Sequence, residues 1–405
     1  MLRRKVFWER VKPFVGTELI KVITGIRRCG KSVMLELIKE ELRDQGVNPG
    51  NFISLNFEDL ANRQFCTAEA LNEHLEKAIV PLEGRVYLFL DEVQEVAEWE
   101  RCINSLRVKY TVDIYITGSN AKLLSGELAT YLAGRYVEIA ITPFSFTEFT
   151  ELYRTLEPEL SVADAFQHFI VFGGMPFLHN LQYKAEPSYQ YLRDVYNSVI
   201  LKDIVKRNHI RDVDLLDRII LYVVANAGRP FSATSISRYF KHEGRITAPE
   251  TILNYLRACE DAFLFHRIHR QDLMGKKILT VYEKYYLSDH GLREAVYGEN
   301  KRDIGLILEN IVCMELLRRG YTLTFGTIHD KEIDFVAERR RERIYIQVAY
   351  LLASEETVNR EFSPLLKIRD NYPKYVLSMD EFDMSRDGIL HRNIRDFLMD
   401  QGDVS

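Results

Sequence analysis

The chain has 405 residues, a formal net charge of −5, 46% hydrophobic residues and 28% charged residues. This composition excludes disordered, collagen-like and low-complexity proteins, and the length predicts about two to four domains. The longest apolar runs, 86–90 and 219–227, are far shorter than the roughly 20 residues that span a bilayer. No apolar signal segment follows the basic N-terminus. We therefore expect a cytoplasmic protein without a membrane partner.

The five cysteines are dispersed along the chain, and no two have the spacing of a metal-ligand pair. An odd, scattered set is typical of reduced thiols in a cytosolic protein. We therefore expect neither structural zinc nor a disulfide framework.

A glycine-rich loop between a strand and a helix is the first chemical signal. Residues 21–26 form a short β-branched run, and apolar residues with helical spacing occupy 33–43. Between them, 25–32 (GIRRCGKS) fits the phosphate-binding pattern G-x-x-x-x-G-K-[ST]. The order of strand, loop and helix is the context that this pattern requires.

The residue types in this loop suit a nucleoside triphosphate. Gly25 and Gly30 let the backbone curl so that N–H groups face phosphate oxygens. Lys31 supplies a cation to the β- and γ-phosphates, and Ser32 offers a hydroxyl ligand to Mg²⁺. The predicted nucleotide-binding residues are Gly25, Arg28, Cys29, Gly30, Lys31, Ser32 and Val33.

Two further apolar runs end in polar residues. The run 85–90 ends in Asp91 and Glu92, which predicts a buried parallel strand that opens into a crevice. Asp91 there can bind Mg²⁺ through water, and Glu92 can polarise a water for attack on the γ-phosphate. The run 112–118 ends in Ser119 and Asn120, and either would lie near that water.

These three motifs and the later segment 132–139 (LAGRYVEI), in this order, resemble Walker A, Walker B, sensor 1 and the arginine-finger region of AAA+ ATPases. The segment 141–149 (ITPFSFTEF) resembles a signature of the archaeal-type group, which is related to the STAND NTPases. The resemblance implies an α/β P-loop fold, ATP and Mg²⁺ as cofactors, and a homo-oligomer, expected as a hexameric ring. It also implies that the catalytic residues are Lys31, Glu92, Asn120 and Arg135, and that Arg135 acts on the nucleotide of a neighbouring subunit. The metal-binding residues that it implies are Ser32 and Asp91.

The segments after this domain predict a helical lid and then a winged helix-turn-helix. A glycine-proline motif at 172–177 resembles the lid of the same group. Helical patterns at 214–227, 232–240 and 248–260 precede two alternating segments, 263–269 and 276–282. The residues expected to contact DNA are Arg257, Arg267, Arg270, Lys276 and Lys277. The alternative is a module that binds only proteins.

The C-terminal segment resembles PD-(D/E)xK nucleases in Glu309, Asp334 and the strand 344–349. Gln347 and Ala349 stand where that pattern has its acid and lysine, so we expect a restriction-endonuclease-like α/β domain without cleavage activity. The basic run 339–343 is either a phosphate-binding patch or a solvated hairpin turn.

The sequence thus predicts four parts: an ATPase core (1–155), a lid (156–210), a winged helix (211–298) and a nuclease-like domain (299–405). The predicted function is ATP hydrolysis coupled to the binding or remodelling of DNA, with branched or junction DNA as the leading candidate. The alternative is a STAND-like signalling switch whose C-terminal half binds a protein or a ligand.

Overall fold

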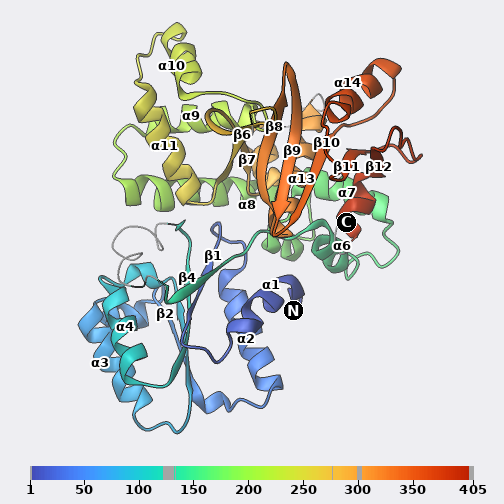
Figure 1. Ribbon diagram of the computed structural model, residues 1–405. Coiled ribbons are helices and arrows are strands. Elements are labelled where there is room, and N and C mark those ends of the chain that lie inside the picture. Colours follow the sequence, from blue (N-terminus) through green and yellow to red (C-terminus); the bar gives the residue numbers. More distant parts are fainter. Residues whose placement is uncertain (1, 122–131, 133, 276, 299–302, 401–405) are drawn as a thin grey trace. The chain divides into compact units, whose positions relative to one another are not determined.

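The computed structural model describes residues 2–121, 132, 134–275, 277–298 and 303–400 (Figure 1). The chain divides into two compact units. The first comprises 1–142 and 261–263, and the second comprises 143–260 and 264–405.

The first unit is built on a five-stranded parallel sheet in the order β2-β3-β4-β1-β5. The strands are β1 (Ile20–Thr24), β2 (Phe52–Asn56), β3 (Val86–Asp91), β4 (Val112–Gly118) and β5 (Tyr136–Ala140). Every residue of β1 and β4 is buried, as expected for parallel strands covered on both faces. The strands predicted from the apolar runs are therefore confirmed.

Helices connect these strands, because parallel neighbours need crossover connections. The helices are α1 (Lys5–Val11), α2 (Lys31–Asp44), α3 (Ala68–Ile79) and α4 (Trp99–Lys109). Thr67 caps α3 by accepting a hydrogen bond from the amide of Ala70. Leu71 and Leu75 of α3 and Ile103 of α4 are buried in one cluster with strand residues. Short 3₁₀ turns occupy Lys12–Phe14, Pro49–Asn51, Leu60–Phe65 and Val93–Glu95.

The second unit begins with helices. They are α6 (Phe146–Tyr153), α7 (Val162–Phe172), α8 (Ala185–Ser198) and a π-helical turn (Val199–Lys206), with a 3₁₀ turn at Pro176–Leu181. Ser145 and Glu148 form a reciprocal capping box at the start of α6. Phe146 and Phe149 of α6 pack on Phe169 of α7. The region 156–210 is thus largely helical, and its role as a lid stays a prediction.

The three helices and the hairpin predicted next are also present. They are α9 (Val213–Ala225), α10 (Ala233–His242), α11 (Pro249–Asp261), β6 (Phe265–Asp272) and β7 (Lys277–Leu287). The two strands are antiparallel, and β6 also pairs in parallel with a later strand, β8. The hairpin is therefore part of a larger sheet, and the winged-helix assignment stays a prediction.

That larger sheet has seven strands in the order β12-β11-β10-β9-β8-β6-β7. Its remaining strands are β8 (Thr322–Ile328), β9 (Lys331–Arg339), β10 (Glu342–Val348), β11 (Lys374–Ser378) and β12 (Leu390–Asn393). The helices are α12 (His290–Tyr297), α13 (Ile304–Arg318), α14 (Glu355–Leu366) and α15 (Ile394–Met399). One sheet thus draws strands from both sides of position 298, and the nuclease-like assignment and the four-part division stay predictions.

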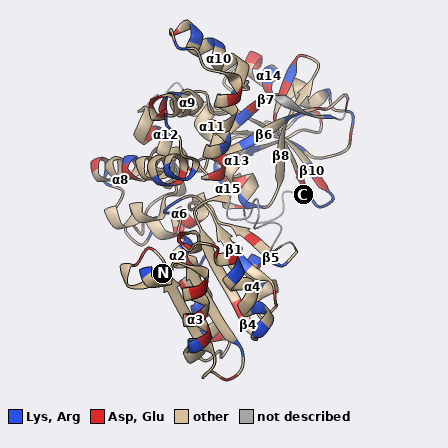
Figure 2. Cartoon of the chain, turned by 90° about the vertical axis from the view of Figure 1, so that its left-hand side faces the viewer, with Lys and Arg blue, Asp and Glu red and all other residues tan. Residues whose placement is uncertain are grey.

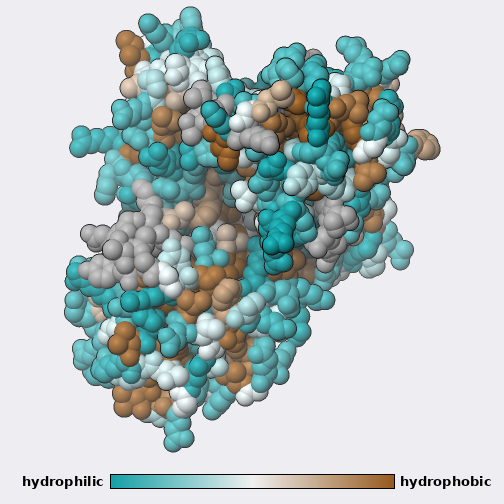
Figure 3. All heavy atoms as spheres, viewed as in Figure 1, coloured by the Kyte–Doolittle hydropathy of each residue, from teal (hydrophilic) through white to brown (hydrophobic). Residues whose placement is uncertain are grey.

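The surface carries both signs of charge. Figure 2 shows Lys and Arg interspersed with Asp and Glu along helices such as α3, α4 and α8. On the face in Figure 3, hydrophilic side chains surround separate hydrophobic patches. Among the described residues, none of the helices has the length and apolarity needed to cross a membrane.

Candidate active site

The polar residues predicted for catalysis, except Arg135, lie where the strands of the first sheet end. Strand β4 lies between β1 and β3, and all three run parallel. Their carboxyl ends therefore share an edge, which is where α/β sheets bind ligands. The loop 25–32 follows β1, the pair Asp91 and Glu92 ends β3, and Ser119 and Asn120 follow β4.

The glycines of the loop have backbone conformations that favour glycine. Gly25 has φ +143°, and a Cβ there would lie 2.2 Å from the carbonyl oxygen of Ile141. Gly30 has φ +102° and is the N-cap of α2, but it offers no side-chain acceptor. The first amides of α2 are therefore not capped by a side chain, and this is the usual arrangement for binding a phosphate.

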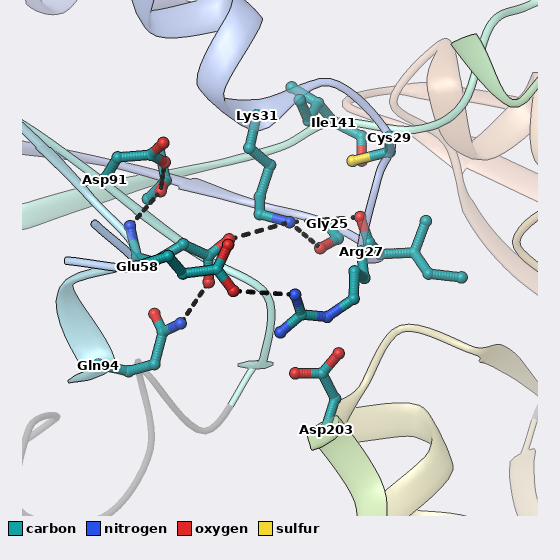
Figure 4. A network of polar contacts seen from close by, with 12 residues as sticks. Gly25, Arg27, Cys29, Lys31, Glu58, Asp91, Gln94, Ile141 and Asp203 are labelled. Atoms are coloured by element: carbon teal, nitrogen blue, oxygen red, sulfur yellow. Dashed lines mark hydrogen bonds and ion pairs between the residues drawn. The ribbon is translucent and has the colours of Figure 1, made fainter. Parts of the chain in front are cut away.

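Lys31 points back over the loop (Figure 4). Its Nζ donates hydrogen bonds to the carbonyl oxygens of Gly25 (3.2 Å) and Ile26 (3.3 Å). The same Nζ lies 3.9 Å from Oε1 of Glu92, and Lys31 is only 4% exposed. The ammonium group is thus fixed between the loop and the acidic end of β3.

The hydroxyl of Thr117 joins the two acids of β3. It donates a hydrogen bond to Oδ1 of Asp91 and accepts one from the amide of Glu92 (2.9 Å). Nδ2 of Asn56, at the end of β2, donates to Oδ2 of Asp91 (3.2 Å). The carboxylate of Glu92 accepts a hydrogen bond from the side-chain amide of Gln94. Both acids are therefore held by neighbouring strands and turns.

The residues present fit a Mg²⁺ ion that is carried in with a nucleotide. Ser32 is exposed at the start of α2, and Asp91 ends the neighbouring strand β3. Among the described residues, no group of three or more His, Cys, Asp or Glu is arranged to hold a metal ion. This sparse donor set suits Mg²⁺, which keeps several waters and takes the rest of its ligands from phosphates.

The other loop residues differ in their surroundings. Cys29 is buried, its Sγ lies 3.7 Å from the carbonyl oxygen of Ile141, and burial raises the pKa of its thiol. Arg28 (φ +69°) and Val33 are exposed. Cys29 thus packs against the end of the sheet, while Arg28 and Val33 face solvent.

Two contacts of the loop were not predicted from the sequence. Nη1 of Arg4 donates to the carbonyl oxygen of Cys29 (3.3 Å), and Nη1 of Arg27 pairs with Oε1 of Glu58 (3.1 Å). Both arginines are buried. Arg4 lies outside the motif and Arg27 occupies one of its unspecified positions, so the motif did not point to either contact.

Arg135 lies at the opposite end of the first sheet, where the strands begin. Its carbonyl oxygen accepts a hydrogen bond from the amide of Ile20, the first residue of β1. The five residues of β1 separate the two edges by roughly 13 Å, at about 3.3 Å per residue. The exposed Arg135 side chain donates to Oδ1 of Asn104 on α4 (3.2 Å). Arg135 is therefore not part of the cluster around Lys31 in its own chain.

The residues predicted to contact DNA differ in their exposure and in their contacts with other side chains. Arg257 on α11 and Lys277 on β7 are exposed. Arg267 forms ion pairs with Glu260 (3.1 Å) and Glu283 (3.4 Å). The guanidinium of Arg270 lies 5.5 Å from the ring centroid of Tyr282. Lys276 lies outside the described residues.

A second lysine–acid cluster lies in the second unit, where the sequence resembles a nuclease. Nζ of Lys284, on β7, lies 2.9 Å from Glu309, 2.7 Å from Glu332 and 3.7 Å from Asp334. Burial opposes the charge of Lys284, but these acids together raise its pKa. Oε1 of Gln347 accepts a hydrogen bond from the amide of Asp334 (3.3 Å). Sequence reasoning grouped Glu309, Asp334 and Gln347 but missed Lys284.

Two known proteins resemble this chain over most of its length. Residues 17–150 match the family described as "AAA domain", and residues 163–303 match a "Domain of unknown function (DUF8612)". An uncharacterized protein of Haemophilus influenzae is 36% identical over 401 residues, 98% of this chain and 99% of that protein. An uncharacterized protein of Methanocaldococcus jannaschii is 32% identical over 361 residues, 84% of this chain and 77% of that protein. The chain belongs to one family with these two proteins, and its residues 17–150 match the AAA domain.

The AAA match covers the loop 25–32, both acids of β3, Asn120 and Arg135. Solved structures align only loosely. Aeropyrum pernix ORC1, solved in complex with DNA, gives a TM-score of 0.32 at 13% identity over 73% of this chain and 92% of that chain. A STAND protein from Pyrococcus horikoshii gives 0.30 at 13% identity over 91% of this chain and 47% of that chain. At these TM-scores the alignments carry no inference about function.

Proposed function

We propose that this AAA-domain protein binds and hydrolyses ATP at the edge formed by β1, β3 and β4. The observation that carries the proposal is the convergence of Lys31, Asp91, Glu92 and Asn120 at the ends of three adjacent parallel strands. In the proposed reaction, Lys31 leaves its loop carbonyls to bind the β- and γ-phosphates. Glu92 orients and deprotonates the attacking water, and Asn120 holds that water or the γ-phosphate.

Mg²⁺ is proposed to bind Ser32 directly and Asp91 through water. Bound there with ATP, it neutralises the charge that develops on the phosphates. Thr117 and Asn56 fix the carboxylate of Asp91, so the chain itself supplies the orientation of that ligand. The uncapped amides at the start of α2 hold the remaining phosphate oxygens.

Arg135 is proposed to act on the nucleotide of a neighbouring subunit. Its place at the far edge of its own sheet supports this, because within one chain the body of β1 separates it from Lys31. An arginine supplied in trans is worth about 10³–10⁵ in rate. Hydrolysis would therefore require a homo-oligomer, which we propose to be a hexameric ring.

The proposed use of this hydrolysis is the binding or remodelling of DNA, branched or junction DNA in particular. Support comes from α11 and the β6–β7 hairpin, where Arg257 and Lys277 are exposed cations. Arg267 supports the proposal less, because Glu260 and Glu283 already neutralise it. Phosphate contacts of this kind bind without reading sequence.

The test is the steady-state ATPase rate of the purified full chain, alone and with single-stranded, duplex or four-way-junction DNA. We expect one DNA to stimulate the rate and Lys31→Ala to abolish it. The double variant Arg257→Ala/Lys277→Ala should keep the basal rate and lose the stimulation, while the control Arg360→Ala on α14 keeps both. A basal rate that no DNA changes would contradict the coupling to DNA and would favour the switch that binds a protein or a ligand.

A further inference from the structure

The C-terminal sheet carries a large groove that contains none of the residues of the proposed ATPase site. It has a volume of about 1340 Å³ and is lined by the β6–β7 turn, the β8–β9 turn, the β9–β10 turn and the segment 366–372 at the end of α14. Figure 1 shows β9 and β10 as neighbouring strands with α14 beside them. Pockets for small molecules are usually about 300–1,000 Å³. The size therefore suits a stretch of linear polymer better than a single small ligand.

The groove has more positive than negative side chains, and the excess positive charge is carried by arginines. Its four acids each have a partner: Asp330 pairs with Lys367, Glu338 with Arg343, Glu342 with Arg339, and Asp370 with Lys374. Within the part of the chain that the structure describes, the side chains of Arg340, Arg341 and Arg369 form no ion pair or hydrogen bond. All three are exposed. The uncompensated charge of the groove is thus positive and consists of guanidinium groups, which bind phosphates with paired donors.

The conformation of Arg340 indicates that this charge serves more than the fold. Arg340 and Arg341 form the two-residue turn between β9 and β10, and Arg340 has φ +56°. Glycine and asparagine adopt this conformation in hairpin turns with less strain. The fold alone would favour one of them, so the arginine is a costly choice at this position.

An aromatic side chain stands beside the arginines. Tyr372 is 43% exposed in the groove, and the guanidinium of Arg343 lies 5.7 Å from its ring centroid. The adjoining segment is tied to the sheet, because the hydroxyl of Tyr345 donates to Oδ2 of Asp370 (2.6 Å). An exposed ring beside free cations is the arrangement on which unpaired bases stack, whereas the bases of a duplex are already stacked.

We propose that this groove binds single-stranded nucleic acid, with phosphates on Arg340, Arg341 and Arg369 and a base on Tyr372. This groove borders the β6–β7 turn at Leu273 and Met274, but, among the residues that the structure describes, none of the cations assigned to DNA on α11 and that hairpin lines it. Its binding does not require ATP. Of the two alternatives for the run 339–343, the proposal takes the phosphate-binding patch.

The experiment measures fluorescence anisotropy of a labelled oligothymidylate of about 20 nucleotides with the full chain, over a series of salt concentrations. The variant Arg340→Asn/Arg341→Gln/Arg369→Gln should bind at least tenfold more weakly. Its plot of log affinity against log salt should be flatter by about 0.7 for each phosphate that the variant no longer neutralises. Tyr372→Ala should weaken binding while leaving that slope unchanged. Arg360→Gln, on α14 but outside the groove, is the matched control.

Two further measurements separate the outcomes. Arg340→Asn alone should weaken binding and yet raise the midpoint of urea unfolding, since asparagine suits the turn. Lys31→Ala should bind the oligonucleotide normally, so a failure of the ATPase proposal would leave this one standing. Unchanged affinity and slope in the triple variant would overturn the proposal. So would tighter binding of a duplex of equal length than of the single strand.

Discussion

The two units each contain a lysine among carboxylates, and the two clusters differ in access. In the first unit, Lys31 bonds to carbonyl oxygens of its own loop and lies 3.9 Å from Glu92, beside the exposed Ser32. In the second, Lys284 is 1% exposed and has Glu309 and Glu332 within 2.9 Å. The first lysine can exchange its partners for phosphate. The second is already neutralised by fixed acids.

The comparison shows that residue type alone does not make a ligand site. Burial of a charge is costly unless the charge is paired, and full pairing leaves nothing to bind a ligand. Burial and the neighbouring Glu309 raise the pKa of Asp334 well above its usual range, which favours the neutral form of this carboxyl. The negative charge of the second cluster is therefore balanced within the cluster. We interpret the first cluster as catalytic and the second as structural. Variants of Glu92, Lys284 and Thr117 test this difference, and a variant of His290 tests the burial of a charge elsewhere in the second unit.

Glu92→Gln should have the largest effect. The amide keeps the shape of the side chain but cannot accept a proton, so hydrolysis should fall about 10²–10⁴-fold while ATP still binds. Steady-state ATPase assays and titration with a fluorescent ATP analogue measure the two quantities. Glu95→Gln, at an exposed acid in the next turn, is the control. A Glu92→Gln protein of nearly normal rate would remove Glu92 from the mechanism.

Lys284→Met should leave the ATPase rate of the folded protein unchanged and lower its free energy of unfolding by about 3–5 kcal/mol, because the buried acids Glu309 and Asp334 lose their cation. Denaturant unfolding measures this loss. Lys277→Met, at the exposed start of the same strand, should cost less than about 0.5 kcal/mol. Adding Glu309→Gln to Lys284→Met should recover part of the stability. If Lys284→Met instead abolished hydrolysis without lowering stability, our distinction between the clusters would be wrong.

Acid should destabilise the second unit through His290. Burial lowers the pKa of His290 to about 4, and its Nε2 lies 2.6 Å from the carbonyl oxygen of Phe169. Between pH 6.5 and 4 this residue takes up a proton in the unfolded chain but not in the folded chain, so the contribution of His290 to stability is full above about pH 6.5 and falls by roughly 3 kcal/mol as pH drops to 4. His290→Gln should flatten this dependence in urea-unfolding curves, and the exposed control His242→Gln should not. An identical slope in both variants would exclude His290 as the cause.

Thr117→Val should have the smallest effect. It removes the hydroxyl that joins Asp91 and Glu92 but leaves both carboxylates in place. Removing a hydrogen bond to a charged group costs about 1.5–3 kcal/mol, so we expect roughly a tenfold loss in kcat/KM and a higher Mg²⁺ requirement. Mg²⁺ titrations of the ATPase rate measure it, with Thr111→Val at the exposed approach to the same strand as control. A Mg²⁺ requirement equal to that of the control would contradict a role for Thr117 in positioning Asp91.

The sequence predicted the strands and strand-end residues of the first unit better than the contacts of the second unit, for a physical reason. The loop 25–32 and the pair Asp91 and Glu92 are local patterns, and the ends of parallel strands meet without further information. The pairing of β6 with β8 and the approach of Lys284 to Glu309 depend on tertiary packing between distant segments. The spacing of apolar residues along the sequence does not indicate which distant segments pair. The contact of Arg4 with Cys29 was missed for the same reason.

The most direct test mixes two inactive proteins. Lys31→Ala keeps Arg135 but lacks the phosphate-binding lysine, and Arg135→Ala keeps the loop but lacks the arginine. We predict that each alone hydrolyses ATP at least about 10³-fold more slowly than the unmodified chain, and that an equal mixture recovers a substantial fraction of the normal rate. Arg101→Ala, on the exposed face of α4, should be active by itself. A mixture as inactive as its components would contradict hydrolysis completed by a neighbouring subunit.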